Sequence, residues 1–246
     1  MPPPYTAPRL WKSPRTPAST CFLSPRDPLS ALPVTTKDQT IMAETEQQPQ
    51  LYLISPPELE LTQFPDTLAR VLDAHAIACV RLALDTRDED RLSRAADALR
   101  AVTDARDVAL VITDNVPLAE RLGLDGVHLT LPGSVRAARK VLGPDAIVGA
   151  FCGGSRHDGL SAGEAGADYI AFGPVQGHDA DDDSFAEAEL FQWWSEVIEI
   201  PVIAEGNLDR AQIAALAPYT DFFGIGAEIW GQDDPAAALT ALLADM

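Results

Sequence analysis

Residues 78–103 read ACVRLALDTRDEDRLSRAADALRAVT, and this stretch contains one complete strand–helix unit. The run Ala78–Leu84 is almost continuously apolar, which is typical of a strand buried on both faces. In the segment Asp88–Thr103 that follows, apolar residues recur at intervals of three and four, as in a helix that packs one face on a sheet. Together the two patterns predict a unit of a parallel α/β fold.

The same two patterns alternate eight times between Leu51 and the C-terminus. Short apolar runs predict strands at Leu51–Ser55, Ala78–Leu84, Val108–Asp114, Gly126–Thr130, Ile147–Cys152, Tyr169–Pro174, Val202–Gly206 and Phe222–Ile229. Helical spacing predicts helices at about Pro65–Ala74, Asp88–Thr103, Val116–Leu122, Ser134–Leu142, Leu160–Ala165, Phe185–Ile198, Asp209–Leu216 and Pro235–Ala244.

Eight βα units in about 195 residues match a compact (β/α)8 TIM barrel, a fold of the α/β class. An open doubly wound sheet is the alternative, but no GxGxxG motif follows the first strand. We therefore predict one domain, a single barrel over residues 46–246. In this fold the functional residues lie where the strands end, at the C-terminal face.

Residues 1–45 differ in composition from the rest of the chain. Nine of the 20 prolines fall within residues 1–41, where no helical or strand periodicity is visible. Because proline lacks a backbone donor, we expect a disordered Pro-rich extension. Two alternatives stay open: a targeting segment, or a start codon assigned too early, with Met42 as the first residue.

The overall charge excludes several classes of function. There are 37 acidic and 18 basic residues, a formal net charge of −19. This balance argues against nucleic acid and against an anionic membrane surface as partners, since both need clustered Lys and Arg.

No apolar run reaches the roughly 18 residues of a membrane span. The cysteines, Cys21, Cys79 and Cys152, form no CxxC pair, which fits a reducing cytoplasm.

The predicted strand ends carry the candidate site residues. Gly206 precedes a predicted helix, and Gly226 lies in the last strand, so both favour either an anion site of backbone amides or tight turns. Asp114 is a candidate magnesium ligand or general base, or the N-cap of the next helix. His128 lies within the fourth strand and is a candidate catalytic residue or a hydrogen-bonded barrel histidine.

Three further features have less defined roles. The loop Gly177–Asp183 holds four carboxylates and His178, a set that favours either a hard divalent cation or plain solvation. Cys152 has one basic neighbour, Arg156, which is weak support for a reactive thiol. Of the pair Trp193–Trp194, we expect one ring to pack on the sheet and the other to cover a helix seam or a homo-oligomer contact.

From Leu51 onward the chain resembles the thiamine phosphate synthases and the related thiazole tautomerases. The resemblance covers about residues 51–245. It rests on strings that occur in the family's order and spacing: Leu51–Ile54 (LYLI), Val111–Asn115 (VITDN), Leu124–Leu129 (LDGVHL), Gly166–Val175 (GADYIAFGPV) and Ile200–Ala204 (IPVIA).

The resemblance implies a transferase of thiamine biosynthesis that forms a C–N bond between an aminopyrimidine diphosphate and a thiazole phosphate. It implies small phosphorylated heterocycles as substrates, Mg²⁺ as cofactor and possible assembly of copies into a homo-oligomer. Asp114 and His128 would be the catalytic residues, and Asp114 the metal ligand. The substrate and its phosphates would bind at Arg81, Gly206, Asn207, Gly226 and Ala227.

Several positions depart from the family pattern. The family's Gln-Leu-Arg-x-Lys falls on Arg81–Asp85, so its lysine becomes Asp85, and past Met42 the single lysine is Lys140. The tautomerase histidine falls on Gly153. Three functions therefore stay open: a divergent family enzyme, acting on its own or another phosphorylated heterocycle; a non-catalytic or regulatory ligand-binding barrel; and a different, metal-assisted enzyme that uses Glu205, Asp114 and residues 178–183.

Overall fold

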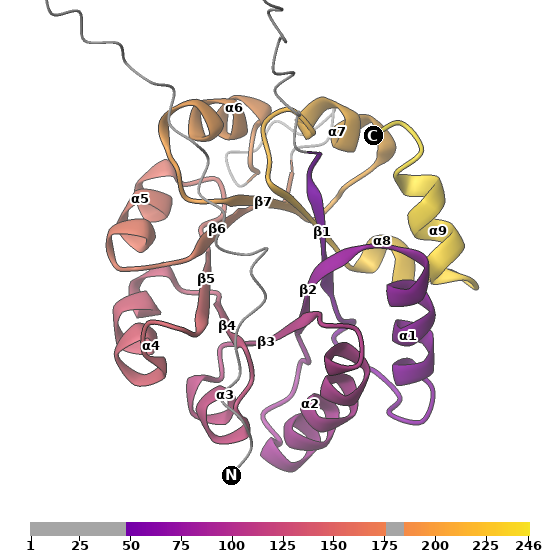
Figure 1. Cartoon of the computed structure of the whole chain (residues 1–246). Helices are drawn as coiled ribbons and strands as arrows, with labels where there is room; N and C mark the ends of the chain where they lie inside the picture. The colour runs from indigo at the N-terminus through magenta and orange to yellow at the C-terminus, as the bar shows by residue number, and fades with distance from the viewer. Residues whose placement is uncertain (1–47, 176–184) are drawn as a thin grey trace, which may run out of the picture.

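The computed structural model describes residues 48–175 and 185–246, and these form a closed barrel of parallel strands inside a ring of helices (Figure 1). The strands follow one another around the barrel in chain order, and β8 pairs with β1. Their bounds are β1 Gln50–Ile54, β2 Ile77–Leu82, β3 Ala109–Thr113, β4 Gly126–Leu129, β5 Ile147–Phe151, β6 Tyr169–Phe172, β7 Val202–Glu205 and β8 Phe222–Ile225. The predicted (β/α)8 fold is confirmed.

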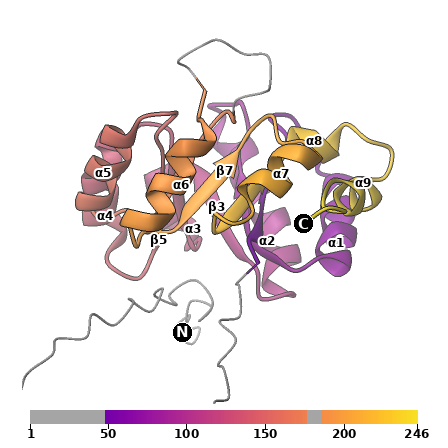
Figure 2. The ribbon, with the colours of Figure 1, turned by 90° about the horizontal axis from the view of Figure 1, so that it is seen from above.

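The helices lie around the strands, as the side view in Figure 2 shows. Their bounds are α1 Phe64–Ala74, α2 Glu89–Asp104, α3 Val116–Leu122, α4 Val135–Leu142, α5 Arg156–Glu164, α6 Ala188–Val197, α7 Arg210–Leu216, α8 Ala227–Trp230 and α9 Pro235–Leu242, with a 3-10 turn η2 at Pro132–Ser134. None of the helices within the described parts of the chain is long and apolar enough to cross a membrane.

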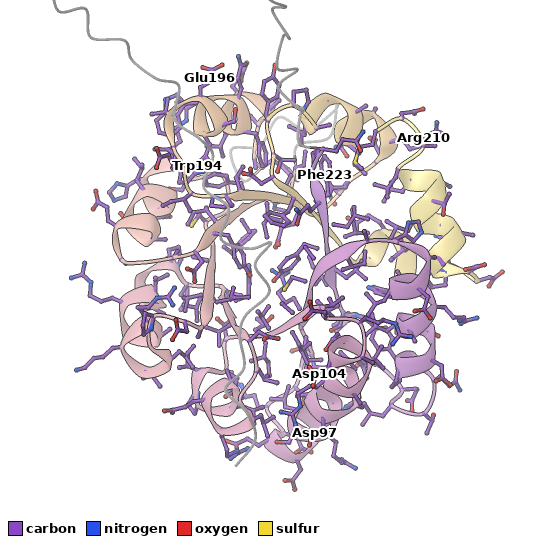
Figure 3. All side chains as sticks on the ribbon, in the orientation of Figure 1. Asp97, Asp104, Trp194, Glu196, Arg210 and Phe223 are labelled. Carbon is purple, nitrogen blue, oxygen red and sulfur yellow. The ribbon has the colours of Figure 1, made fainter. Side chains whose placement is uncertain are left out.

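Alternate residues of each strand face two different cores. The outer core fills the layer between strands and helices, and Trp194 and Phe223 lie in this layer in Figure 3, whereas Glu196 and Arg210 point outward. The inner core lies inside the barrel and is small, because it is made of Tyr52, Cys79, Ala109, Val111, Ile147, Tyr169, Ala171, Ile203 and Phe222. Because side chains alternate along a strand, a residue two positions from an inner-core residue on the same strand also faces the barrel interior.

The tryptophan pair was predicted correctly in part. Trp194 is fully buried, packs edge-on against Phe172 at 5.0 Å between ring centroids, and donates its indole N–H to the Ile200 carbonyl at 2.8 Å. The Arg156 guanidinium lies 4.9 Å from the centroid of the Trp193 ring. Trp193 thus covers a seam between α5 and α6, and the homo-oligomer stays a prediction.

Two predicted elements differ from the structure. The last strand was predicted to reach Ile229, but β8 ends at Ile225 and the short helix α8 follows. Helix α8 is held in place because Trp230 donates to the Ile54 carbonyl at 2.6 Å and packs on Phe64. Helix α5 begins at Arg156 rather than near Leu160, since the Ser155 hydroxyl caps it by accepting from the Asp158 amide.

Candidate active site at the barrel mouth

The interior of the barrel holds one cation and one carboxylate from the strands. Among all residues of β1 to β8, Arg81 is the single Lys or Arg and Glu205 the single Asp or Glu. Arg81 lies two residues after Cys79 on β2, and Glu205 two residues after Ile203 on β7, so both face inward. Each is only 8% exposed.

Arg81 and Glu205 form a paired ion bridge across the barrel. The two terminal nitrogens of Arg81 donate to the two carboxylate oxygens of Glu205 at 3.0 and 3.3 Å. Burial is the largest single effect and would lower the pKa of Arg81, but the Glu205 carboxylate together with Tyr52 and Tyr169 raises the pKa overall. The guanidinium is therefore permanently charged, and its charge is neutralised by Glu205.

Glycines make room for Glu205. Gly224 is the register partner of Glu205 on β8, and a Cβ there would lie 2.8 Å from the Glu205 Cβ. A Cβ on Gly173 would lie 2.1 Å from the Glu205 carbonyl oxygen. The small neighbours let the carboxylate sit inside the barrel rather than above it.

A directed chain of hydrogen bonds runs down from Arg81. Arg81 donates to Nε2 of His128 at 2.6 Å, and because a guanidinium has only donors, Nε2 must accept. The ring proton then lies on Nδ1, which donates to the Tyr169 hydroxyl at 2.9 Å, and the hydroxyls of Tyr169 and Tyr52 share a hydrogen bond at 2.8 Å. His128 is thus held as one neutral tautomer.

The environment of this chain shifts each titratable group. Burial lowers the pKa of His128 well below its usual range, and the positive charge of Arg81 adds to the effect. Burial also raises the pKa of Tyr52 and of Tyr169. All three side chains are therefore uncharged at neutral pH, and Arg81 with Glu205 supplies the charges of the network.

Asp114 lies at the rim, where its carboxylate is already occupied. Its φ is +53°, a left-handed conformation, and its side chain is exposed. One carboxylate oxygen accepts from the Thr130 amide at 2.8 Å and the other from the Thr130 hydroxyl. The Asp114 side chain thus ties the end of β3 to the end of β4. The structure brings the Asp114 backbone to His128, since its amide donates to the His128 carbonyl at 2.9 Å.

The residues predicted to bind phosphate lie on two adjacent loops. Gly206 and Asn207 follow β7, both with positive φ, at +77° and +58°. Gly226 caps α8 and Ala227 is its first residue. The amide of Gly226 donates to a carboxylate oxygen of Glu228 at 2.8 Å. Arg81 lies inside the barrel, bonded to Glu205, so the structure does not add it to these loops.

The magnesium ligand set implied by the resemblance does not fit the described residues. Both Asp114 oxygens serve Thr130, and within residues 48–175 and 185–246 no group of three or more His, Cys, Asp and Glu side chains could hold a metal ion. The acidic residues 178–183 lie outside the described part. Magnesium therefore stays a prediction, and no step of a reaction is derived through it.

Cys152 does not have the environment of a nucleophile. It is buried at the end of β5, and burial, followed by the nearby Asp158, raises its pKa to about 12. A thiol with this pKa holds almost no thiolate at neutral pH. Its neighbour Arg156, the one basic residue near it in sequence, stacks on Trp193 instead.

Some residues of the site were missed from sequence. The pairing of Arg81 with Glu205, the two tyrosines and the Glu228 contact were not predicted. A signal existed for the pair: a lone cation and a lone carboxylate at inward positions of buried strands must neutralise each other. The Glu228 contact had none, because Glu228 was placed in the last strand. The catalytic roles predicted for Asp114 and His128 stay predictions.

Comparison with known proteins supports one family. The sequence model of the family described as Thiamine monophosphate synthase matches residues 51–226. The thiamine-phosphate synthase of Rhodospirillum centenum is 40% identical over 77% of this chain and 93% of its own length. That of Erythrobacter litoralis is 41% identical over 80% of this chain and 95% of its own.

Solved structures agree on the fold. Thiamine phosphate pyrophosphorylase from Pyrococcus furiosus superposes with a TM-score of 0.68 at 22% identity, covering 81% of this chain and 96% of that one. 3-Hexulose-6-phosphate synthase superposes with a TM-score of 0.60 at 18% identity, over 80% of this chain and all of that one. On the family match and on relatives at 40–41% identity, this chain belongs to the thiamine monophosphate synthase family.

Proposed function

We propose that this chain binds a thiamine-related heterocycle at the mouth of its barrel, and that it couples a diphosphate substrate weakly or not at all. The observation that carries the proposal is the bidentate contact of Arg81 with Glu205. Family membership supports the ligand class, and the occupied arginine supports the loss of diphosphate chemistry.

A diphosphate leaving group needs positive charge that is free to meet it. Arg81 is the one cation on a strand of this barrel, and Glu205 already neutralises it. Turning Arg81 toward a ligand would leave Glu205 buried without a partner, a cost of about 3–5 kcal/mol. The position just after β2 where the family, by resemblance, has a lysine is Asp85 here, a carboxylate that repels a diphosphate.

The hydrogen-bond chain supports binding rather than proton transfer. His128 uses Nε2 for Arg81 and Nδ1 for Tyr169, so neither nitrogen is free to take a proton from a ligand. The chain instead holds Arg81 at one place in the barrel mouth. A rigid, electrically neutral floor suits a flat heterocycle that is oriented by hydrogen bonds.

The first test is a coupling assay on the full chain with the aminopyrimidine diphosphate, the thiazole phosphate and Mg²⁺. The R. centenum relative serves as the reference under the same conditions. If the lack of a free cation at the diphosphate raises the activation free energy by about 4 kcal/mol, turnover should be roughly 10³-fold below that of the reference. In parallel, the unphosphorylated aminopyrimidine or thiazole alcohol is expected to raise the melting temperature of this chain. Turnover equal to that of the reference, or no binding of either alcohol, would contradict the proposal.

Synthase activity itself is the second candidate function, because relatives at 40–41% identity carry that name. Glu205→Gln separates the two candidates. If Glu205 withholds Arg81 from the diphosphate, the amide releases the guanidinium and turnover rises above that of the unmodified chain. If the chain is an ordinary synthase, the same substitution lowers turnover by weakening the buried network.

A further inference from the structure

Glu228 joins the two loops at which the sequence predicted phosphate binding. One of its carboxylate oxygens accepts from the Gly226 amide at 2.8 Å, and the other accepts from the Leu208 amide at 3.3 Å. Gly226 directly follows β8, and Leu208 lies in the loop after β7. A single side chain thus uses one amide from each loop.

These amides lie where (β/α)8 barrels commonly hold phosphate. In such barrels the loops after the seventh and eighth strands present backbone N–H groups to the phosphate oxygens. A carboxylate and a phosphate compete for the same donors, since each offers anionic oxygens a short distance apart. A phosphate ester entering here would have to displace Glu228 and would meet its negative charge.

The barrel mouth keeps polar atoms that suit an uncharged ligand. Within the described residues, Nε of Arg81 and Oγ1 of Thr113 are buried and have no hydrogen-bond partner. Arg81 is 8% exposed, and Thr113 lies two residues after the inner-core residue Val111, so both face the barrel interior. The Arg81 N–H and the Thr113 hydroxyl lack a partner among the described residues, and a ring nitrogen or a hydroxyl group that reached them would supply one.

We propose that Glu228 is the specificity-determining residue that excludes phosphate from this rim. The heterocycle bound there then carries a hydroxyl or another neutral group where family substrates carry a phosphate ester. The inference rests on the proposed function, because it names the substrate class of the same site. It also narrows the sequence-based prediction of a phosphorylated heterocycle.

The test is a calorimetric titration of the full chain with inorganic phosphate, with thiazole phosphate and with the thiazole alcohol. In the unmodified chain, the alcohol is expected to bind at least about tenfold more tightly than its phosphate ester. Glu228→Ala frees both amides, and its dissociation constants for phosphate and for thiazole phosphate are expected to fall at least about tenfold. Asp233→Ala, which removes an exposed charge just beyond α8, controls for charge alone and should change neither value.

Two outcomes would overturn the inference. One is a Glu228→Ala chain that binds inorganic phosphate no more tightly than the unmodified chain. The other is an unmodified chain that prefers thiazole phosphate over the alcohol. If Glu228→Ala does not fold, Glu228→Gln decides, because it keeps an acceptor for one amide and removes the charge. The two proposals fail in different experiments. The proposed function fails if neither alcohol binds the unmodified chain. The role of Glu228 is tested by the titration with inorganic phosphate, which needs neither alcohol.

Discussion

The Arg81 guanidinium reaches across the barrel from β2 and meets the Glu205 carboxylate of β7 with two hydrogen bonds, at 3.0 and 3.3 Å. These strands are not neighbours in the sheet, because β8 and β1 lie between them. The pair therefore links opposite sides of the barrel through side chains, in addition to the backbone hydrogen bonds between neighbouring strands. The negative charge of Glu205 also balances the positive charge of Arg81 next to the inner core.

Breaking this pair on one side should strongly destabilise the protein. Arg81→Leu or Glu205→Leu leaves the remaining charge buried and unpaired, and each is expected to lower the free energy of unfolding by about 3–5 kcal/mol. The double variant Arg81→Leu/Glu205→Leu should lose much less than the sum of the two, because no lone charge remains. Urea unfolding of the unmodified chain, the two single variants and the double variant gives the three changes in the free energy of unfolding.

A matched control for the pair exists on the surface. Arg210 and Asp245 also form a close contact, but both side chains are more than half exposed. Asp245→Asn is expected to cost no more than about 1 kcal/mol. If the two Leu single variants cost as little as Asp245→Asn, the buried pair is not what holds the barrel interior.

His128 should make stability depend on pH. Burial lowers its pKa in the folded chain, so below about pH 6.5 the unfolded chain binds a proton that the folded chain does not. The unfolded state is therefore stabilised relative to the folded state as pH falls, and stability is lost downward from about pH 6.5 at a rate approaching about 1.4 kcal/mol per pH unit. Above that pH the contribution of His128 is constant.

The measurement compares urea unfolding of the unmodified chain and His128→Gln between pH 5 and pH 8. Carboxylates titrate in both chains, so the difference between the two curves isolates His128. The amount by which the unmodified chain exceeds His128→Gln in free energy of unfolding should shrink as pH falls below about 6.5, since only the unmodified chain has His128 to be protonated on unfolding. A difference that stays constant over this range would show that His128 is not held neutral.

The strand positions could be predicted because the barrel is built from repeats of one simple pattern. Apolar runs such as Ile147–Phe151 and Val202–Glu205 are buried on both faces, so composition alone located them to within one or two residues. The last strand failed for a physical reason. Residues 222–227 are as apolar as a strand, but Gly226 caps a helix there and Trp230 donates a hydrogen bond to β1.

The site could be predicted only where it depends on one element. From sequence, Arg81 could be placed within the second strand and Glu205 at the end of the seventh, but their contact depends on the curvature that brings β2 and β7 face to face. The tyrosines of the hydrogen-bond chain lie in strings, such as Tyr169–Phe172, that otherwise look purely apolar. Tertiary geometry, rather than local preference, decides both.

Gly149 should be essential for the position of Tyr169. A Cβ at Gly149 would lie 1.9 Å from the Tyr169 ring, so an alanine there must push the phenol away from His128. Gly149→Ala is expected to cost about 1–3 kcal/mol or more, as overpacking of a core does. Gly133→Ala is the control, because a Cβ there meets nothing within 4 Å.

The explanation by overpacking can be tested with a second substitution. Tyr169→Leu removes the ring that the new methyl group would strike, so Gly149→Ala should cost less in this background than in the unmodified chain. Thermal and urea unfolding of the four chains give the comparison. An equal cost in both backgrounds would point to the backbone of β5, rather than to the Tyr169 ring, as the origin of the effect.

The binding of Mg²⁺ to this chain should not depend on Asp114. Both carboxylate oxygens of Asp114 already accept hydrogen bonds from Thr130, so a cation at Asp114 would compete with these bonds. A ligand that binds the folded chain raises its melting temperature, and the size of the rise reports binding. Millimolar Mg²⁺ is therefore expected to shift the melting temperature of Asp114→Ala as much as that of the unmodified chain.

The acidic residues 178–183 provide the complementary variant. Any shift with Mg²⁺ that persists in Asp114→Ala but disappears in Asp181→Asn/Asp182→Asn/Asp183→Asn locates the cation at residues 178–183. Chelation with EDTA should reverse it, and Ca²⁺ in place of Mg²⁺ tests how selective the carboxylates are. The opposite result, a shift that Asp114→Ala alone abolishes, would place the metal at the rim. The Thr130 contacts would then be a resting arrangement that the cation replaces.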